Sequence, residues 1–88
     1  MLERDIEKYL GLRVKSMGGI SYKFVSPGRV GVPDRIVVLP GARLMFVELK
    51  APGKKPAAHQ LREHARLMAL GQRVEVIDSL AGVARLLA

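Results

Sequence analysis

Hydrophobic residues recur along this chain at two spacings, one typical of helices and the other typical of strands. Apolar residues return every three or four positions in three stretches, which predicts three amphipathic helices: Leu2 to about Lys15, about Ala57 to Leu70, and Leu80 to Leu87. Short runs rich in β-branched and aromatic residues predict four strands: residues 20–26, the two arms of a hairpin within 31–50, and residues 73–78. The expected order is helix, three strands, helix, strand, helix.

The helix expected between the third and fourth strands is long enough to bring those two strands side by side in parallel. We therefore expect an α/β fold with a mixed sheet. The hairpin arms are apolar on both faces, a pattern typical of strands that are covered on both sides. The last helix can either cover the sheet or form an interface with a second copy. The helix at 57–70 has an apolar stripe made of Ala57, Ala58, Leu61, Ala65 and Met68.

The charge balance adds a class of partner to this picture. The chain has 88 residues, enough for one domain at most, with 15 Lys and Arg against 8 Asp and Glu and a net charge of +7. In so small a chain this favours nucleic acid as the partner, with a merely basic soluble surface as the alternative. No cysteine is present, which excludes disulfides, thiolate zinc sites and cysteine nucleophiles. No signal peptide or membrane span is expected. The lack of cysteine is compatible with a reducing cytoplasm, which is the expected location.

The hairpin brings three charged residues to one of its ends. A turn at Pro40-Gly41-Ala42 can close a loop of three or five residues, and either choice sets Asp34 directly opposite Glu48 on one face. Lys50 follows Glu48 by two positions and shares that face. A four-residue loop would place the two acids on opposite faces, so the predicted site depends on the odd loop.

Two facing carboxylates on covered strands repel each other unless a cation compensates them. Mg²⁺ binds through one or two carboxylates together with substrate phosphate, and it can polarise a phosphate oxygen. The Lys50 ammonium can stabilise the charge that develops on the phosphorus centre or orient the attacking water. In the alternative interpretation Asp34 is a turn residue, and Glu48 and Lys50 are an edge-strand charge pair. That alternative leaves an acid pair at the end of an apolar hairpin unexplained.

Pro33-Asp34 followed by Glu48-Leu49-Lys50 resembles the PD-(D/E)xK motif of restriction-like nucleases. A closer resemblance is to the stand-alone VRR-NUC domain of phage and bacterial proteins. It rests on an ordered set of features: residues 31–35, the short hairpin, residues 46–51 and a downstream Gln60. The resemblance covers nearly the whole chain, so residues 1–88 are expected to form a single domain of this type. It implies a restriction-endonuclease-like mixed β-sheet flanked by helices, in the order α-β-β-β-α-β-α.

The resemblance also implies Mg²⁺- or Mn²⁺-dependent cleavage of DNA, by a homodimer acting on branched substrates such as four-way (Holliday) junctions. Carried over by position, Asp34 and Glu48 would be metal ligands, with the Leu49 backbone carbonyl as a third and Lys50 as the catalytic lysine. It places the protein in the cytoplasm of a bacterial cell or a phage-infected host. It leaves open a helicase or another repair or replication protein as a partner.

The family has a further acid on its first helix, and two residues compete for that place here. Glu3 lies about 50° from the centre of the apolar stripe and Glu7 about 90°, so Glu3 points more nearly at the sheet and is the expected metal ligand. For both, the alternative is a solvated acid in the first helical turn. Gln60 can bond a water or a ligand carboxylate as part of the catalytic set, or be a plain boundary residue. His64 and His59 are expected to be surface or boundary residues.

Basic residues flank the predicted site on both sides. Loops of this kind can carry phosphate contacts, and the expected DNA-binding residues are Lys23, Arg29, Arg35, Lys54 and Lys55. No aromatic residues interleave with them, so binding should be dominated by the DNA backbone and sensitive to salt. The competing functions are a repair-type exonuclease or flap nuclease of the same fold, a restriction-type endonuclease, a non-catalytic DNA-binding module, and a plain interaction domain.

Overall fold

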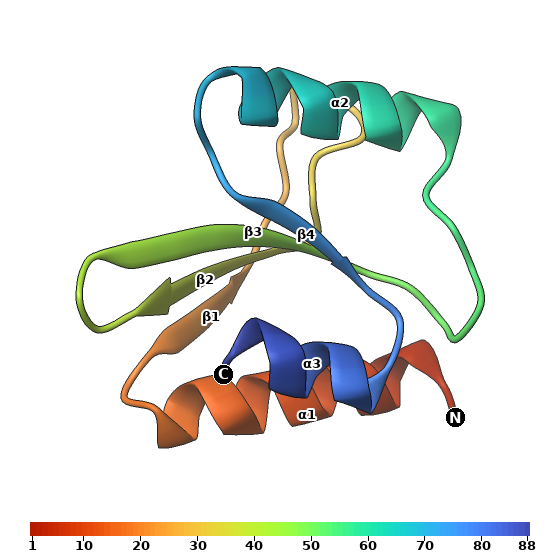
Figure 1. The fold of residues 1–88 in the computed structure, drawn as a ribbon. Helices are drawn as coiled ribbons and strands as arrows, with labels where there is room; N and C mark the ends of the chain where they lie inside the picture. Colours follow the sequence, from red (N-terminus) through yellow and green to blue (C-terminus); the bar gives the residue numbers. More distant parts are fainter.

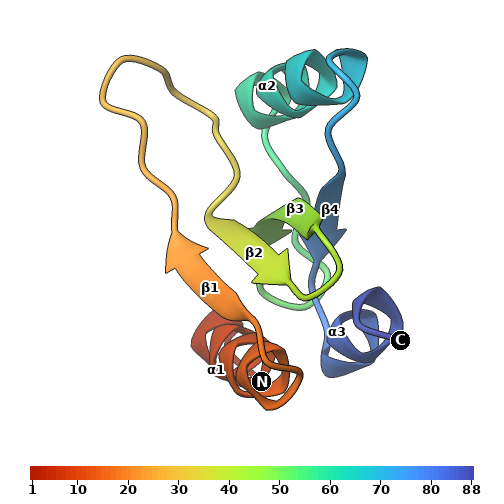
Figure 2. The ribbon, with the colours of Figure 1, turned by 90° about the vertical axis from the view of Figure 1, so that its left-hand side faces the viewer.

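The computed structural model describes residues 1–88 and places one mixed sheet between helices (Figure 1). The elements follow the predicted order: α1 (Glu3–Ser16), β1 (Ile20–Lys23), β2 (Arg35–Leu39), β3 (Arg43–Leu49), α2 (Ala58–Ala69), β4 (Val74–Ile77) and α3 (Leu80–Leu86). Helices α1 and α3 cover one face of the sheet, and α2 lies on the other side (Figures 1 and 2). None of the three helices has the length and apolar character that a membrane span requires.

The strands lie in the sheet in chain order, β1-β2-β3-β4. Strands β1, β2 and β3 pair antiparallel, whereas β3 and β4 pair parallel through the α2 crossover, as predicted. The turn of the hairpin has three residues, because Leu39 pairs directly with Arg43. Gly41 and Ala42 both have positive φ, of 83° and 59°, which lets so short a turn close. The odd loop on which the predicted site depends is therefore present.

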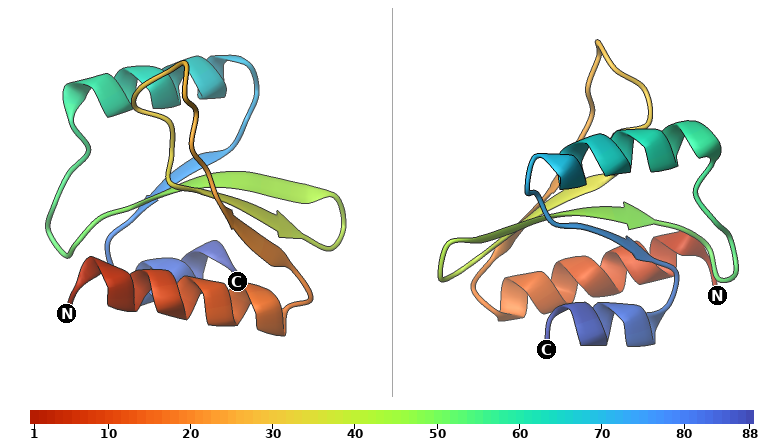
Figure 3. Two further views of the ribbon diagram at one scale, coloured as in Figure 1. Left: turned by 180° about the vertical axis from the view of Figure 1, so that it is seen from behind. Right: turned by 45° about the horizontal axis from the view of Figure 1, so that its top comes forward.

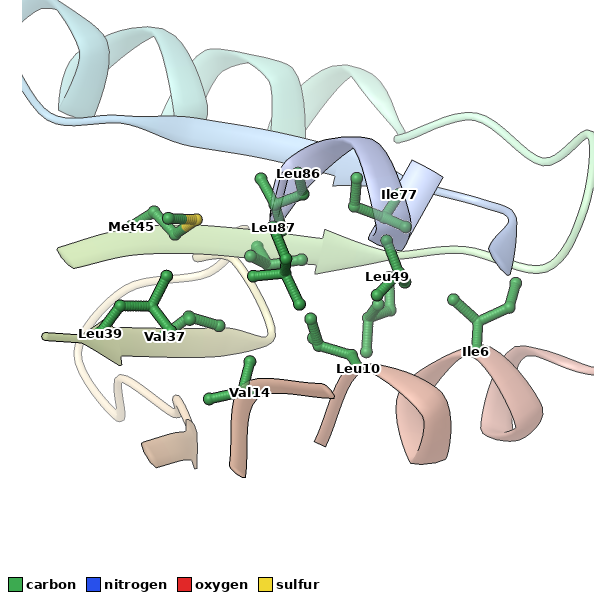
Figure 4. Close-up of a cluster of buried hydrophobic side chains, with 12 residues drawn as sticks. Ile6, Leu10, Val14, Val37, Leu39, Met45, Leu49, Ile77, Leu86 and Leu87 are labelled. Carbon is green, nitrogen blue, oxygen red and sulfur yellow. The ribbon is translucent and has the colours of Figure 1, made fainter. Parts of the chain in front are cut away.

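The hydrophobic core lies between the sheet and the helix pair α1 and α3 (Figure 4). Alternate residues of β2 and β3 point into it, and α1 contributes one stripe, so the twelve core residues are Ile6, Leu10, Val14, Val37, Leu39, Met45, Val47, Leu49, Ile77, Val83, Leu86 and Leu87. The Ser79 side chain starts α3 by accepting a hydrogen bond from the Gly82 backbone N–H at 2.9 Å. Of the two roles open to the last helix, the structure shows the covering of the sheet.

The opposite face of the sheet is only partly covered, which corrects two expectations. The stripe predicted to be the packing face of α2 points to solvent: Leu61 and Met68 are 52% and 51% exposed. The helix instead turns Glu63 and His64 inward, where both are buried. The hairpin strands are likewise not covered on both sides, because Leu44 is 47% exposed on the α2 side of the sheet.

Strand β1 is shorter than the predicted 20–26 and ends at Lys23. The Phe24 backbone N–H still donates to the Asp34 carbonyl at 2.7 Å, and the chain then leaves the sheet as a loop that rises beside α2 (Figures 2 and 3). Gly31 in this loop has φ of +86°, and a Cβ atom there would lie 2.7 Å from the His59 carbonyl oxygen. Contact between the loop and α2 therefore requires glycine at this position.

Candidate active site

Asp34 and Glu48 face each other at the end of the hairpin where β2 begins and β3 ends. The register that pairs Arg35 with Val47 places Asp34 opposite Glu48, one step further along the two strands. The Leu49 backbone N–H donates to Asp34 Oδ2 at 2.8 Å. This bond ties the Asp34 side chain to the edge of β3, next to the second acid.

Glu48 is 1% exposed, and its two oxygen atoms have different surroundings. Oε2 accepts a hydrogen bond from Gln60 Nε2 at 3.0 Å and lies 3.4 Å from the Lys50 ammonium. Oε1 has no hydrogen-bond partner; its neighbour is His64 Nε2 at 3.7 Å, which is buried and also unpaired. A buried carboxylate oxygen without a partner costs free energy, so this atom marks a place where a ligand would be stabilised.

Gln60 is held in one orientation by the start of α2. Its side-chain oxygen accepts a hydrogen bond from the Ala57 backbone N–H at 2.8 Å, which satisfies one of the free donors of the first helical turn. Its amide nitrogen is then directed at Glu48. Gln60 thus links the start of the crossover helix to the acid pair and does not lie free at the boundary.

The electrostatics of the pair favour a cation as its ligand. Burial first, and then the neighbouring Asp34 carboxylate, raise the pKa of Glu48 to about 7, and Lys50 offsets only part of the effect. Burial lowers the pKa of His64 below its usual value, so the neutral imidazole is favoured. The neighbouring side chains therefore do not compensate two ionised carboxylates at this site.

A divalent cation fits the donors that are present. Mg²⁺ and Mn²⁺ prefer oxygen ligands, and the site offers the two carboxylates, including the unpaired Glu48 Oε1. No group of three or more His, Asp or Glu side chains is close enough together to hold a metal ion. An ion here would therefore be completed by main-chain, water or substrate oxygens, which is usual for Mg²⁺.

Two acids of α1 line a hollow of about 360 Å³ beside Asp34, and the structure distinguishes them. Glu7 forms an ion pair with Arg35, so its charge is compensated within the protein. Glu3 is exposed and makes no ion pair or hydrogen bond through its side chain. Of the two candidates, Glu3 is the acid that is free to bind a ligand, although it does not form a cluster with Asp34 and Glu48.

The predicted DNA-binding residues do not all lie together. Lys23 and Arg35 line the hollow beside Asp34. Arg29 instead turns to α2, where it lies 3.3 Å from Glu63. The remaining two, Lys54 and Lys55, are exposed on the segment that leads from β3 to α2.

The expectation that His64 is a surface or boundary residue is wrong, since it is 2% exposed and lies over Glu48. His64 follows Gln60 by four positions, so the two share one face of α2. This spacing is a signal in the sequence that could have placed His64 beside the acid pair. His59, by contrast, is exposed.

Comparisons with known proteins show strong likenesses to a phage protein and to a solved structure, while no family model matches the chain. It is 64% identical over 77 residues to "Putative nuclease p44" of Acyrthosiphon pisum secondary endosymbiont phage 1, covering 88% of this chain and 83% of that relative. A solved structure described as a VRR_NUC domain has a TM-score of 0.89 and 40% identity, covering 96% of this chain and 91% of the other.

Proposed function

Because this chain belongs to the VRR-NUC domain family of nucleases, we propose that it hydrolyses DNA phosphodiesters at the Asp34–Glu48 pair with the help of Mg²⁺ or Mn²⁺. The observation that carries this proposal is the buried acid pair with an unpartnered oxygen at Glu48. We propose residues 1–88 as a single nuclease domain. Its setting is the cytoplasm of a bacterial cell or a phage-infected host, where it acts alone or with a helicase or another repair or replication protein.

In this proposal Asp34 and Glu48 hold the cation, with the Leu49 carbonyl as a further ligand. The bound ion supplies Lewis-acid chemistry at a phosphate oxygen and acidifies a water molecule. Lys50, whose ammonium lies 3.4 Å from Glu48, stabilises the charge that develops on the phosphoryl oxygens or orients the attacking water. Gln60 keeps Glu48 in place through its hydrogen bond at 3.0 Å, and Glu3 supplies an outer carboxylate from α1.

Branched DNA such as a four-way junction is the proposed substrate. The net charge of +7 suits a polyanion, and Lys23, Arg29, Arg35, Lys54 and Lys55 are the proposed DNA-binding residues. The chain has few aromatic residues with which to stack bases, so recognition would rest on the DNA backbone and its shape. A symmetric branched substrate requires two cuts, which a homodimer with two sites supplies.

The proposed dimer interface is the apolar surface on the α2 side of the sheet. Ile20, Val38 and Leu44 form one cross-strand row there, and all three are exposed. The exposed stripe of α2, including Leu61 and Met68, adds further apolar area. A second copy would bury side chains that a lone chain leaves in water. Because α3 is packed on the core, it is not the proposed interface.

A cleavage panel tests the proposed function. Linear, nicked, flapped and four-way DNA are incubated with Mg²⁺, with Mn²⁺ or with EDTA, and products are resolved by size. We expect internal cuts in the four-way substrate, no cutting in EDTA, and no cutting by Lys50→Ala. Nucleotide-by-nucleotide trimming from ends would instead favour an exonuclease, and binding without any cleavage would favour a non-catalytic module.

A further inference from the structure

We propose that a groove along α1 and β1 binds one DNA strand as it leads away from the Asp34–Glu48 pair. This inference rests on the proposed function and adds a second phosphate-binding surface to it. The groove lies at the β1 edge of the sheet, and it involves three cations that the site itself does not use, Arg4, Lys8 and Lys15. We call it the α1 groove.

The α1 groove is continuous with the active site. It is a hollow of about 420 Å³ between α1 and β1. Glu7 and Arg35 line both this hollow and the one beside Asp34. At the other end, Gly11, Lys15 and Ser21 also line a third hollow, which continues to Gly19 at the start of β1. The hollows therefore follow one another from Asp34 along α1 to the start of β1, with the Glu7–Arg35 ion pair between the first two.

The charge of the α1 groove suits a phosphodiester backbone. Arg4, Lys8, Gly11 and Lys15 lie on one face of α1, since their spacing of four, three and four positions keeps them within about one sixth of a turn. Arg35 from β2 and Glu7, the single acid in the hollow, form an ion pair with each other, so together they add no net charge. Arg4, Lys8 and Lys15 form no ion pair within the protein, so their charges can pair with a ligand.

Gly11 leaves the middle of this face of α1 without a side chain. It lies in the middle of α1, where glycine is a poor helix former compared with alanine. A Cβ atom at Gly11 would meet nothing within 4 Å, so packing inside the protein does not require glycine there. It lines the groove between Lys8 and Lys15, where the lack of a side chain leaves room for a strand backbone.

The groove is long enough for a defined footprint. A helix of 14 residues is about 21 Å long, so the groove can follow only a short run of consecutive phosphates of one strand. Removal of one cation that binds a phosphate should reduce the slope of log affinity against log salt by about 0.9. Two quantities can therefore be measured: the positions at which a neutral phosphate weakens binding, and the slope of log affinity against log salt.

The test measures DNA binding in EDTA, where no cutting is expected, with a labelled four-way substrate whose phosphates are replaced one at a time by neutral methylphosphonates. In the parent, replacements on one side of the cut should weaken binding over a short run of consecutive positions. In Lys8→Gln with Lys15→Gln, that sensitivity should disappear and the salt slope should fall by about two. The control, Arg43→Gln with Arg85→Gln, removes the same charge away from the groove and should behave like the parent.

A second pair of variants tests the same groove without changing charge. Gly11→Leu fills it, and should lower DNA affinity several-fold while the protein stays at least as resistant to heat, because leucine is the better helix former. Gly11→Ala adds only a Cβ and should bind like the parent. If the parent binds and cuts DNA while the Lys8/Lys15 and Gly11→Leu variants bind as it does, the groove inference alone is overturned. A parent that neither binds nor cuts DNA overturns the proposed function together with it.

Discussion

Among single residues, Glu48 is the centre of the proposed active site. It is the best-buried acid in the chain, it accepts from Gln60, and one of its oxygens has no partner. Such a group is costly when it is unpaired and well matched to a cation. Its pKa of about 7 should make stability depend on pH. The unpaired nitrogen of His64, next to that oxygen, should affect the rate of cleavage.

The raised pKa of Glu48 predicts how stability depends on pH in EDTA. The folded protein holds the proton of Glu48 up to about pH 7, whereas the unfolded chain loses it near 4.5. The contribution of Glu48 to the free energy of unfolding is therefore highest below pH 4.5. It falls as the pH rises to about 7, by at most ~3 kcal/mol. Denaturant titrations of the parent should show this decline relative to Glu48→Gln, which cannot titrate. Parallel curves for the two proteins would contradict it.

His64 should act through Glu48 as a positioning residue. We expect His64→Leu to fold but to lose about 10-fold in single-turnover rate, since it removes the polar neighbour of Oε1. His64→Gln keeps a donor at that place and should recover most of the rate. A merely structural role would make the two variants differ in thermal stability and not in rate per folded molecule, so both quantities should be measured.

At the scale of elements, α2 and the loop between β1 and β2 frame the acid pair from one side. Arg29 of the loop meets Glu63 of α2 at 3.3 Å, and Gly31 approaches the His59 carbonyl. The start of α2 in turn holds Gln60 against Glu48. The loop therefore supports the helix that positions the site.

Gly31→Ala should weaken the contact between α2 and the loop that joins β1 to β2. The new Cβ would stand 2.7 Å from a backbone oxygen at a φ of +86°, which should cost about 1–3 kcal/mol in the free energy of unfolding. Gly28→Ala is the matched control in the same loop, because its Cβ meets nothing within 4 Å. Denaturation of both variants, followed by cleavage assays, should show a loss for the first alone. Equal stability of the two would argue against a docked loop.

The elements also show why sequence predicted some features and missed others. The order of elements along the chain, the parallel crossover and an odd hairpin turn of three or five residues follow from local spacing and from Pro40-Gly41-Ala42, so they were predictable. The orientation of α2 was not, because a stripe with Leu61 and Met68 and a stripe with Gln60 and His64 lie side by side on the helix. Contacts from distant segments decide which stripe faces inward: Glu48 accepts a hydrogen bond from Gln60, and Arg29 pairs with Glu63.

Over the whole molecule, two surfaces beyond the acid pair are proposed to take part in the function. The α1 groove lies at the β1 edge and is basic, whereas the row of Ile20, Val38 and Leu44 on the α2 side is apolar and uncovered. Light scattering, with and without DNA, should give the mass of two chains, with a return to one on dilution. A mass of one chain at every concentration would contradict the proposed homodimer.

The single-turnover rate of DNA cleavage by Asp34→Asn, at saturating Mg²⁺, decides whether the acid pair is the active site. The substitution keeps the shape of the side chain and its bond to the Leu49 N–H, but removes one charge of the proposed metal site. We predict an unchanged fold and a rate at least about 100-fold below the parent. Cleavage by the freshly purified variant at the parent's rate would contradict the assignment of the active site to Asp34 and Glu48.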